Sequence, residues 1–250
     1  MNPLTVLYNE VLFRPLFNLL VGMTNILPHH NVGLSILAVT LFVRLLLLAP
    51  AVHQARLMQT NQSKMSDLKS ELMKIRERYK TNPTKKAEAT MALYRQAGIN
   101  PARGCLPLLI QLPILIALYR VFLIGLGPET YSYLYSFVSE PATAQMSFLG
   151  LDLARASVRL AIAAGVAQFA LMRLSTPPAM PPAAADSDTN AQLMAGMQRN
   201  MAYIFPAMTV FISLQLPAAL SLYWVASTIF GIVQQYIFQR FLNLKSSVAV

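Results

Sequence analysis

Residues 201–239, MAYIFPAMTVFISLQLPAALSLYWVASTIFGIVQQYIFQ, form a run of 39 positions without a charged side chain. A single helix of this length would be about 58 Å long, nearly twice the hydrocarbon thickness of a bilayer, which is about 30 Å. Because proline lacks a backbone N–H and interrupts a helix, Leu216-Pro217 would divide the run. The stretch therefore predicts two membrane spans, over residues 200–216 and 218–239, joined by a tight turn.

The composition of the whole chain also favours a membrane protein. Of its 250 residues, 55% are hydrophobic and 12% are charged, whereas a soluble domain contains about 45–50% apolar and about 25% charged residues. The net charge is nevertheless +10, from 20 Lys and Arg against 10 Asp and Glu. These values exclude an ordinary soluble globule and a disordered chain, and they predict a membrane protein whose basic loops lie on one side.

Three more apolar stretches bring the prediction to an all-α integral membrane protein with five transmembrane helices. They cover residues 32–52, 105–126 and 155–173. The last is the shortest, because only 13 uncharged residues separate Arg159 from Arg173. It spans a bilayer only where these arginines extend toward the headgroups or the bilayer is locally thin.

Residues 53–103 differ in kind from these stretches, because they contain 11 Lys and Arg, four acidic residues and no long apolar run. Apolar side chains follow a heptad pattern on both sides of Thr81-Asn82-Pro83, a sequence typical of a turn. They are Met58, Met65, Leu68, Leu72, Ile75 and Tyr79 before the turn, and Ala87, Met91 and Tyr94 after it. We expect a cytoplasmic helical hairpin, whose basic surface would also suit anionic lipid headgroups or RNA without specificity for a nucleic-acid sequence.

The N-terminal residues 1–30 are predicted to lie outside the cytoplasm and to form an amphipathic helix at the membrane interface. Glu10 and Arg14 have the spacing of a helical ion pair, and Pro15 is expected to interrupt the helix. A sixth membrane span is the alternative for this segment.

The distribution of basic residues orients the chain. Fifteen of the 20 Lys and Arg lie in or beside the hairpin 53–103, the loop 174–199 and the tail 240–250, whereas the loop 127–152 carries none. Since basic residues accumulate in cytoplasmic segments, we expect the N-terminus and the loop 127–152 outside and the C-terminus inside.

Arg44 is a charge without an obvious partner, because all ten Asp and Glu fall outside the five predicted spans. It lies nine residues before His53, about 13 Å from the inner end of the predicted helix, and a charge in hydrocarbon costs at least about 2.5–3.5 kcal/mol. We therefore expect Arg44 to face a polar, water-containing cavity that opens to the cytoplasm and attracts an anion. The alternative is that backbone carbonyls and Thr40 hold Arg44 without an external ligand.

The sequence predicts no catalytic residue, no metal site and no cofactor. It lacks the motifs of zinc proteases, dinucleotide-binding proteins and P-loop NTPases, and a single cysteine, Cys105, cannot form a disulfide within the chain. A proton- or sodium-coupled transporter would need an acidic residue in the membrane. Gln111, Gln168, Tyr223 and Trp224 are polar positions in the spans, where helix packing and the lining of a shared cavity are both open interpretations.

Residues 98–122, GINPARGCLPLLIQLPILIALYRVF, resemble the signature of the YidC/Oxa/Alb family of membrane insertases. TLFVRLLLLAP at 40–50 resembles the first core span of that family, and PAALSLYWVASTIFGIVQQY at 217–236 resembles its last. The resemblance extends from about residue 5 to 242 and indicates a short, core-only bacterial form.

The resemblance implies a function in the cell membrane. Members of this family insert nascent membrane proteins without ATP or a cofactor, through five spans that form a hydrophilic groove open to the cytoplasm and to lipid. Arg44 would receive acidic extracytoplasmic tails, and Gln168 and Trp224 would line the groove. The full set of expected groove residues is Arg44, Thr40, Gln111, Gln168, Tyr223 and Trp224.

The implied partners are nascent membrane proteins and membrane lipids, with the ribosome and a Sec-type translocon as further candidates. Only Arg240 and Lys245 are basic among the last eleven residues, which does not favour ribosome docking through the tail. An anion-selective channel or carrier built on Arg44 is an alternative from another class. A membrane scaffold whose hairpin recruits a soluble partner is a third.

Overall fold

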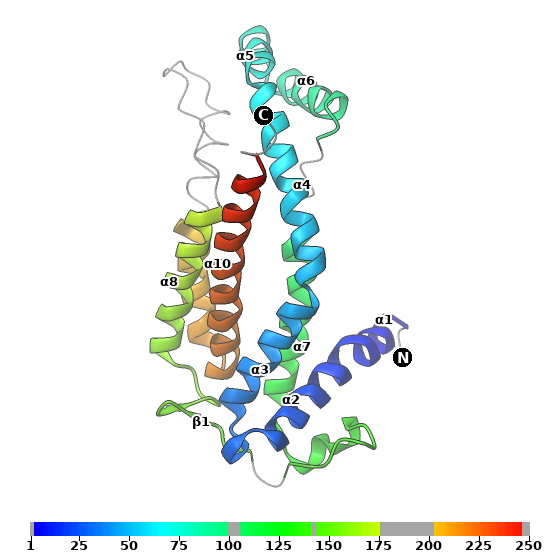
Figure 1. The fold of residues 1–250 in the computed structure, drawn as a ribbon, viewed down its shortest axis with the longest axis vertical. Coiled ribbons are helices and arrows are strands. Elements are labelled where there is room, and N and C mark those ends of the chain that lie inside the picture. The colour runs from blue at the N-terminus through cyan, green and yellow to red at the C-terminus, as the bar shows by residue number, and fades with distance from the viewer. Residues whose placement is uncertain (1–2, 100–105, 142–143, 176–202, 247–250) are drawn as a thin grey trace. The chain divides into compact units, whose positions relative to one another are not determined.

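The computed structural model describes residues 3–99, 106–141, 144–175 and 203–246, which are mostly helical, as predicted (Figure 1). The chain divides into two compact units. The first comprises residues 1–47, 110–177 and 200–250, and the second comprises residues 48–109 and 178–199. Cys105 with part of the signature stretch, most of the predicted loop 174–199 and the end of the predicted tail lie outside the described residues.

The first unit begins with a continuous helical segment (Figure 1). A π-helical turn, η1 (Asn9–Phe13), joins α1 (Pro3–Tyr8) to α2 (Arg14–Ile26). Pro15 has no N–H to donate to the carbonyl of Val11, and the wider π turn directly before it accommodates that loss. The expectation that Pro15 interrupts the helix is therefore wrong. Pro15 lies in the first turn of α2, after the widened turn, and the helical segment continues past it.

This helical segment is apolar on its buried and on its exposed side. Phe13 and Phe17 are fully buried and pack against the ring of Tyr133. Leu7 and Val11, in contrast, are exposed. A helix with this distribution suits contact with lipid near the membrane surface.

α3 (Val32–Leu46) ends earlier than the predicted span. Pro50 cannot donate a hydrogen bond to the carbonyl of Leu46, and α3 ends at that residue. Arg44 consequently lies in the last turn of α3. The expectation of one uninterrupted helix from Arg44 to His53 is therefore wrong.

The segment after α7 (Leu106–Ile124) is folded, although the sequence predicts only a loop there. It contains a 3-10 helix and two short antiparallel strands: η4 (Pro128–Tyr133), β1 (Ser147–Phe148) and β2 (Leu151–Asp152). Leu149 and Gly150 connect the strands, both with positive φ. With two residues each, the strands are too short to produce an alternating pattern in the sequence.

Two asparagine side chains attach this segment to the helices. Asn18 Nδ2 donates to the carbonyl of Tyr133 at 2.9 Å, and Asn18 Oδ1 accepts from the N–H of Tyr135 at 2.7 Å. Asn31 Nδ2 donates to the carbonyl of Ser147 at 2.8 Å. The segment thus forms a folded cover on one end of the first unit.

Three helices complete the first unit: α8 (Val158–Ser175), an unlabelled helix Tyr203–Gln215, and α10 (Ala218–Ser246). α10 packs against α8 and α3 (Figure 1). Gly165 of α8 lies so close to Val210 that a Cβ at this position would overlap its side chain. Close contact through small residues is typical of helix pairs in membranes.

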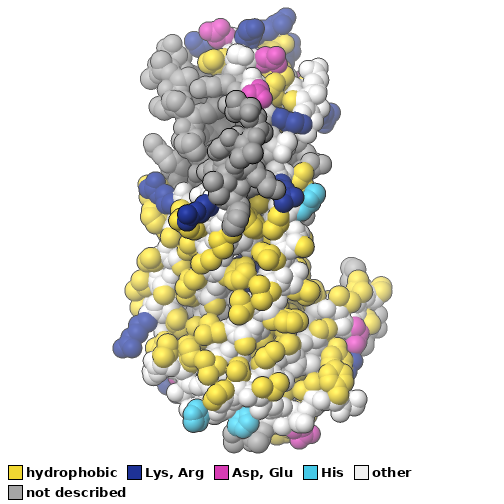
Figure 2. All heavy atoms as spheres, in the orientation of Figure 1, with side chains coloured by type: hydrophobic (Ala, Val, Ile, Leu, Met, Phe, Trp, Pro, Cys, Tyr) yellow, Lys and Arg dark blue, Asp and Glu magenta, His cyan; other side chains and the backbone are white. Residues whose placement is uncertain are grey.

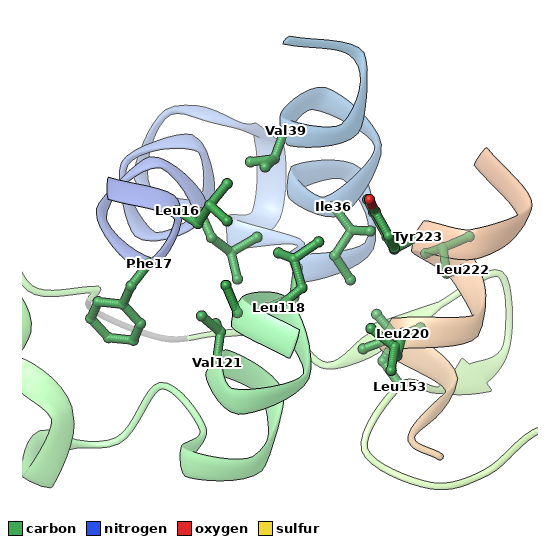
Figure 3. Close-up of a cluster of buried hydrophobic side chains, with 14 of the residues drawn as sticks. Leu16, Phe17, Ile36, Val39, Leu118, Val121, Leu153, Leu220, Leu222 and Tyr223 are labelled. Carbon is green, nitrogen blue, oxygen red and sulfur yellow. The ribbon is translucent and has the colours of Figure 1, made fainter. Parts of the chain in front are cut away.

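The core of the first unit is a cluster of buried side chains drawn from four of its helices (Figure 3). α2 contributes Leu16 and Phe17, α3 contributes Ile36 and Val39, α7 contributes Leu118 and Val121, and α10 contributes Leu220, Leu222 and Tyr223. This cluster fixes α3, α7 and α10 relative to one another, and these are the helices that carry the candidate site.

By length and hydropathy, α8 is the one described helix that qualifies alone as a membrane span, and Val32–Leu46 with Leu48–Asn61 qualifies as a pair. Gln111–Ile124 and Tyr203–Gln215 are apolar but shorter. Large apolar side chains are exposed over the helices of the first unit (Figure 2), among them Leu41, Leu123, Val166 and Phe211. This surface suits lipid, while five membrane crossings remain a prediction.

The second unit contains α4 (Leu48–Asp67), α5 (Lys69–Arg78) and α6 (Pro83–Gln96), of which α5 and α6 pack together. Asn82 caps α6 by accepting a hydrogen bond from the N–H of Lys85 at 3.0 Å. Lys64 Nζ donates to the carbonyl of Ala97 at 3.1 Å and so ties the end of α6 to α4.

The buried face of α6 differs from the predicted heptad positions. Leu72 of α5 and Leu93 of α6 are each only 8% exposed, whereas Met91 is 43% exposed and Ala87 is also exposed. A heptad pattern that continues from α5 into α6 would require both helices to turn the same face toward each other. α6 is a separate helix that begins at Pro83, so its buried face is set independently. Ala87 and Met91, two of the apolar residues with heptad spacing, are therefore exposed on α6.

Candidate functional site

Arg44 of α3 is held by a residue that the sequence analysis does not single out, Ser227 of α10. Arg44 Nε donates to Ser227 Oγ at 3.0 Å, and Arg44 Nη2 donates to the same oxygen. Ser227 is buried and Arg44 is half-buried. A single hydroxyl oxygen therefore orients one edge of the guanidinium.

This contact leaves the charge of Arg44 without a counter-ion. Among the described residues no carboxylate forms an ion pair with Arg44. Glu10 pairs with Arg14, and Asp152 pairs with Arg155. A guanidinium has five N–H donors, and the serine oxygen accepts from only two of its nitrogens. The position of Arg44 in the last turn of α3 favours a cation, because the free carbonyls of a helix C-terminus carry partial negative charge.

Tyr223 and Gln111 extend the polar contacts around Arg44. Gln111 Nε2 of α7 donates to the hydroxyl of the buried Tyr223 at 2.5 Å. The Tyr223 hydroxyl also lies close enough to Arg44 to interact with its charge. Because Tyr223 and Ser227 are four residues apart, they lie on the same face of α10. Arg44, Ser227, Tyr223 and Gln111 form the polar cluster, which joins α3, α10 and α7.

Gln168 and Trp224 form a separate pair between α8 and α10. Trp224 Nε1 donates to Gln168 Oε1 at 3.4 Å, which is long for a hydrogen bond. Gln168 is buried and Trp224 is half-buried. Trp224 follows Tyr223 directly, so its side chain leaves α10 about 100° around the helix axis, and no described hydrogen bond connects this pair to Arg44.

Thr40 does not hold Arg44, contrary to the alternative derived from the sequence. Its Oγ1 donates to the carbonyl of Ile36 at 2.6 Å, within α3 itself. Thr40 is buried, so it lies beside the polar cluster as part of the helix packing. Arg44 is instead held by Ser227 of α10, which no local sequence pattern marks as a partner of Arg44.

Within the described residues no group of three or more His, Cys, Asp or Glu is arranged to hold a metal ion. The polar cluster consists of one cation and three neutral side chains with exchangeable protons. Such a set suits reversible binding of an anion.

The chain matches known proteins over almost its whole length. Residues 23–245, which include all six expected groove residues and Ser227, match the model of a family described as 60Kd inner membrane protein. Membrane protein insertase YidC of Fusobacterium nucleatum is 31% identical over 84% of this chain and 87% of its own length. MisCB of Bacillus subtilis, also named membrane protein insertase, is 33% identical over 93% of this chain and 80% of its own length. Membrane protein insertase YidC of Alkalihalophilus pseudofirmus is 31% identical over 97% of this chain and 86% of its own length.

Proposed function

Because the chain belongs to the 60Kd inner membrane protein family, we propose that it inserts nascent membrane proteins into the cell membrane, the activity that the names of its relatives state. The observation that carries the mechanism is Arg44, a half-buried cation that is oriented by Ser227 and has no carboxylate partner among the described residues.

The first step is the capture of a polar tail. An acidic extracytoplasmic tail of a substrate would supply the carboxylate that Arg44 lacks, and its desolvation would be partly offset by the charge of Arg44. Gln111 and Tyr223, which are hydrogen-bonded to each other beside Arg44, make the surroundings of the guanidinium polar. Thr40, Gln168 and Trp224 would contribute to the wall of a hydrophilic groove open to the cytoplasm.

The second step is the release of the apolar segment of the substrate into lipid. Leu41 and Leu45 flank Arg44 on α3 and are 50% and 53% exposed. An apolar segment whose tail is held at Arg44 would therefore have an apolar surface beside it, and burial of its own surface in lipid would drive the exit. The step makes and breaks no covalent bond.

We further propose the membrane arrangement that this mechanism needs. Five helices cross the membrane, the N-terminus lies outside and the C-terminus lies in the cytoplasm. The folded segment that Asn18 and Asn31 attach to the helices supports a closed outer end. The helices of the second unit would then face incoming chains in the cytoplasm, with the ribosome and a Sec-type translocon as candidate partners.

The test is insertion of a single-span substrate with a short acidic tail into proteoliposomes, scored by protection of the tail from protease. Arg44→Ala is compared with Arg155→Ala, which removes an exposed arginine that pairs with Asp152. We expect protection with the wild type and with Arg155→Ala, and a large loss with Arg44→Ala.

Two outcomes would contradict the proposal. Equal protection with wild-type and Arg44→Ala vesicles would remove Arg44 from the mechanism. Wild-type vesicles that protect no more substrate than empty vesicles, but that conduct anions, would favour the channel or carrier.

A further inference from the structure

A second arginine, Arg120 of α7, has a distinct set of contacts near one end of its helix. Arg120 Nη1 donates to Asn9 Oδ1 at 2.5 Å. Its guanidinium carbon lies 4.5 Å from the centre of the Phe13 ring, in the geometry of a cation–π contact. Both contacts join α7 to the N-terminal helical segment.

These contacts coincide with the irregular part of that segment. The π-helical turn η1 begins at Asn9 and ends at Phe13, the two residues that Arg120 contacts. Single π turns in helices occur frequently at functional sites. Pro15 explains why the helix is distorted here. It does not explain why Arg120 contacts both the first and the last residue of the π-helical turn.

Arg120 also forms no ion pair among the described residues, and Glu10, which follows Asn9 directly, pairs with Arg14 at 2.9 Å. The hydroxyl of Tyr8 is shielded from solvent and has no hydrogen-bond partner among those residues. Burial raises the pKa of Tyr8, and the positive charge of Arg120 opposes this rise, so the two groups are close enough to interact. A cation with free N–H donors thus lies near a hydroxyl that lacks an acceptor.

The surroundings indicate which anion would fit. Arg120 precedes the end of α7 at Ile124 by four residues, which is about 6 Å along the axis. Leu7, Val11 and Leu123 are exposed apolar side chains on the same elements. In a membrane-spanning α7, this places a cation at the depth of the lipid headgroups with apolar side chains around it.

We infer that Arg120, held in place by Asn9 and Phe13, binds the phosphate group of a phospholipid, which anchors the N-terminal helical segment to the membrane. The inference rests on the proposed crossing of the membrane by α7. Arg120 would donate to phosphate oxygens, while Asn9 and Phe13 hold the guanidinium in place. The exposed leucine and valine side chains would contact the acyl chains.

The test measures the thermal unfolding midpoint of the full chain in an uncharged detergent. Short-chain phosphatidylglycerol is added, and inorganic phosphate is added separately to distinguish a lipid from a free anion. A ligand that binds the native state raises the midpoint in a dose-dependent way. Arg120→Gln can keep a donor for Asn9 but removes the charge, and Arg155→Gln removes an exposed charge as the control.

We expect the lipid to raise the midpoint of the wild type and of Arg155→Gln, and we expect this rise to be lost in Arg120→Gln. If Arg120→Gln is poorly folded, Arg120→Lys keeps the charge and should retain part of the response. An undiminished rise in Arg120→Gln would overturn the site, and an equal rise with inorganic phosphate would overturn its assignment to lipid. Because no substrate is inserted, the result is independent of whether the chain acts as an insertase.

Discussion

Arg44 and Arg120 are both arginines without a carboxylate partner among the described residues, yet the protein holds them in different ways. Arg44 donates two hydrogen bonds to the hydroxyl of Ser227. Arg120 donates to the amide oxygen of Asn9 and lies over the ring of Phe13. A hydroxyl orients a guanidinium but stabilises its positive charge only weakly. The face of an aromatic ring also stabilises that charge, through a cation–π interaction.

The difference teaches what each charge is suited to do. The ring of Phe13 occupies one face of Arg120, which suits a ligand that stays in place. Arg44 keeps its charge and further donors available beside exposed apolar side chains, which suits a ligand that arrives and leaves. The comparison thus separates a transient site, proposed for substrate tails, from a resident site, inferred for lipid.

The largest effect is expected from reversing the transient charge with Arg44→Glu. Attraction between unit charges at about 4 Å is worth about 4 kcal/mol near a protein surface, so repulsion should slow insertion of an acidic tail by roughly 100-fold or more. A substrate whose tail acids are replaced by lysines should lose less. The insertion rate of each substrate is measured by protease protection with wild-type protein and with Arg44→Glu. Equal impairment of Arg44→Glu with the acidic and the lysine tail would show that Arg44 does not act through its charge.

Ser227→Ala should have a smaller effect, because it removes the orientation of Arg44 and leaves its charge. A hydrogen bond to a charged group is worth about 1.5–3 kcal/mol. Because the charge of Arg44 remains, we expect the lower end of this range, which is a fall of about tenfold in insertion of the acidic tail. Ser213→Ala is the matched control, since the buried Ser213 hydroxyl has no partner among the described residues. Loss of insertion in both variants alike would indicate a general packing defect.

The sequence indicates a functional role for Arg44 but not for Arg120. The absence of acidic residues from the spans is visible in the sequence and marks Arg44 at once. Ser227 was missed because one serine in an apolar helix carries no signal of its own, and its role depends on how α3 and α10 pack. The contact between Arg120 and Asn9 joins residues 111 positions apart in the chain, a pairing that helical periodicity cannot reveal.

The same limit applies to the fold. The uncharged run, with Pro217 inside it, predicts two helices, and the structure separates Tyr203–Gln215 from α10 at that place. The π turn before Pro15 and the break in α3 before Pro50 show that a proline marks a local distortion without telling which kind. β1 and β2 depend on contacts with distant residues such as Asn31, so local patterns do not predict them.

Tyr223→Phe sharpens the comparison by changing the surroundings of Arg44 without touching its contact with Ser227. Gln111 would lose its acceptor, and an unmade hydrogen bond of this kind costs about 1 kcal/mol of folding stability. We expect a lower unfolding midpoint with most of the insertion retained. A loss of insertion as large as that of Arg44→Glu would instead make the Tyr223 hydroxyl a direct contact of the substrate tail.

The smallest effect is expected from Asn9→Asp, which gives Arg120 a counter-ion within the chain. A partly exposed ion pair is worth about 0–1 kcal/mol, so the unfolding midpoint without lipid should stay the same or rise slightly. The added carboxylate would compete with phosphate for the same donors, and the rise in midpoint on adding short-chain phosphatidylglycerol should therefore shrink. Thr5→Asp, at an exposed position of α1, controls for an added negative charge on the same helical segment. If the lipid raised the midpoint of Asn9→Asp as much as that of the wild type, Arg120 would not be a resident anion site. The distinction between Arg44 and Arg120 would then fail.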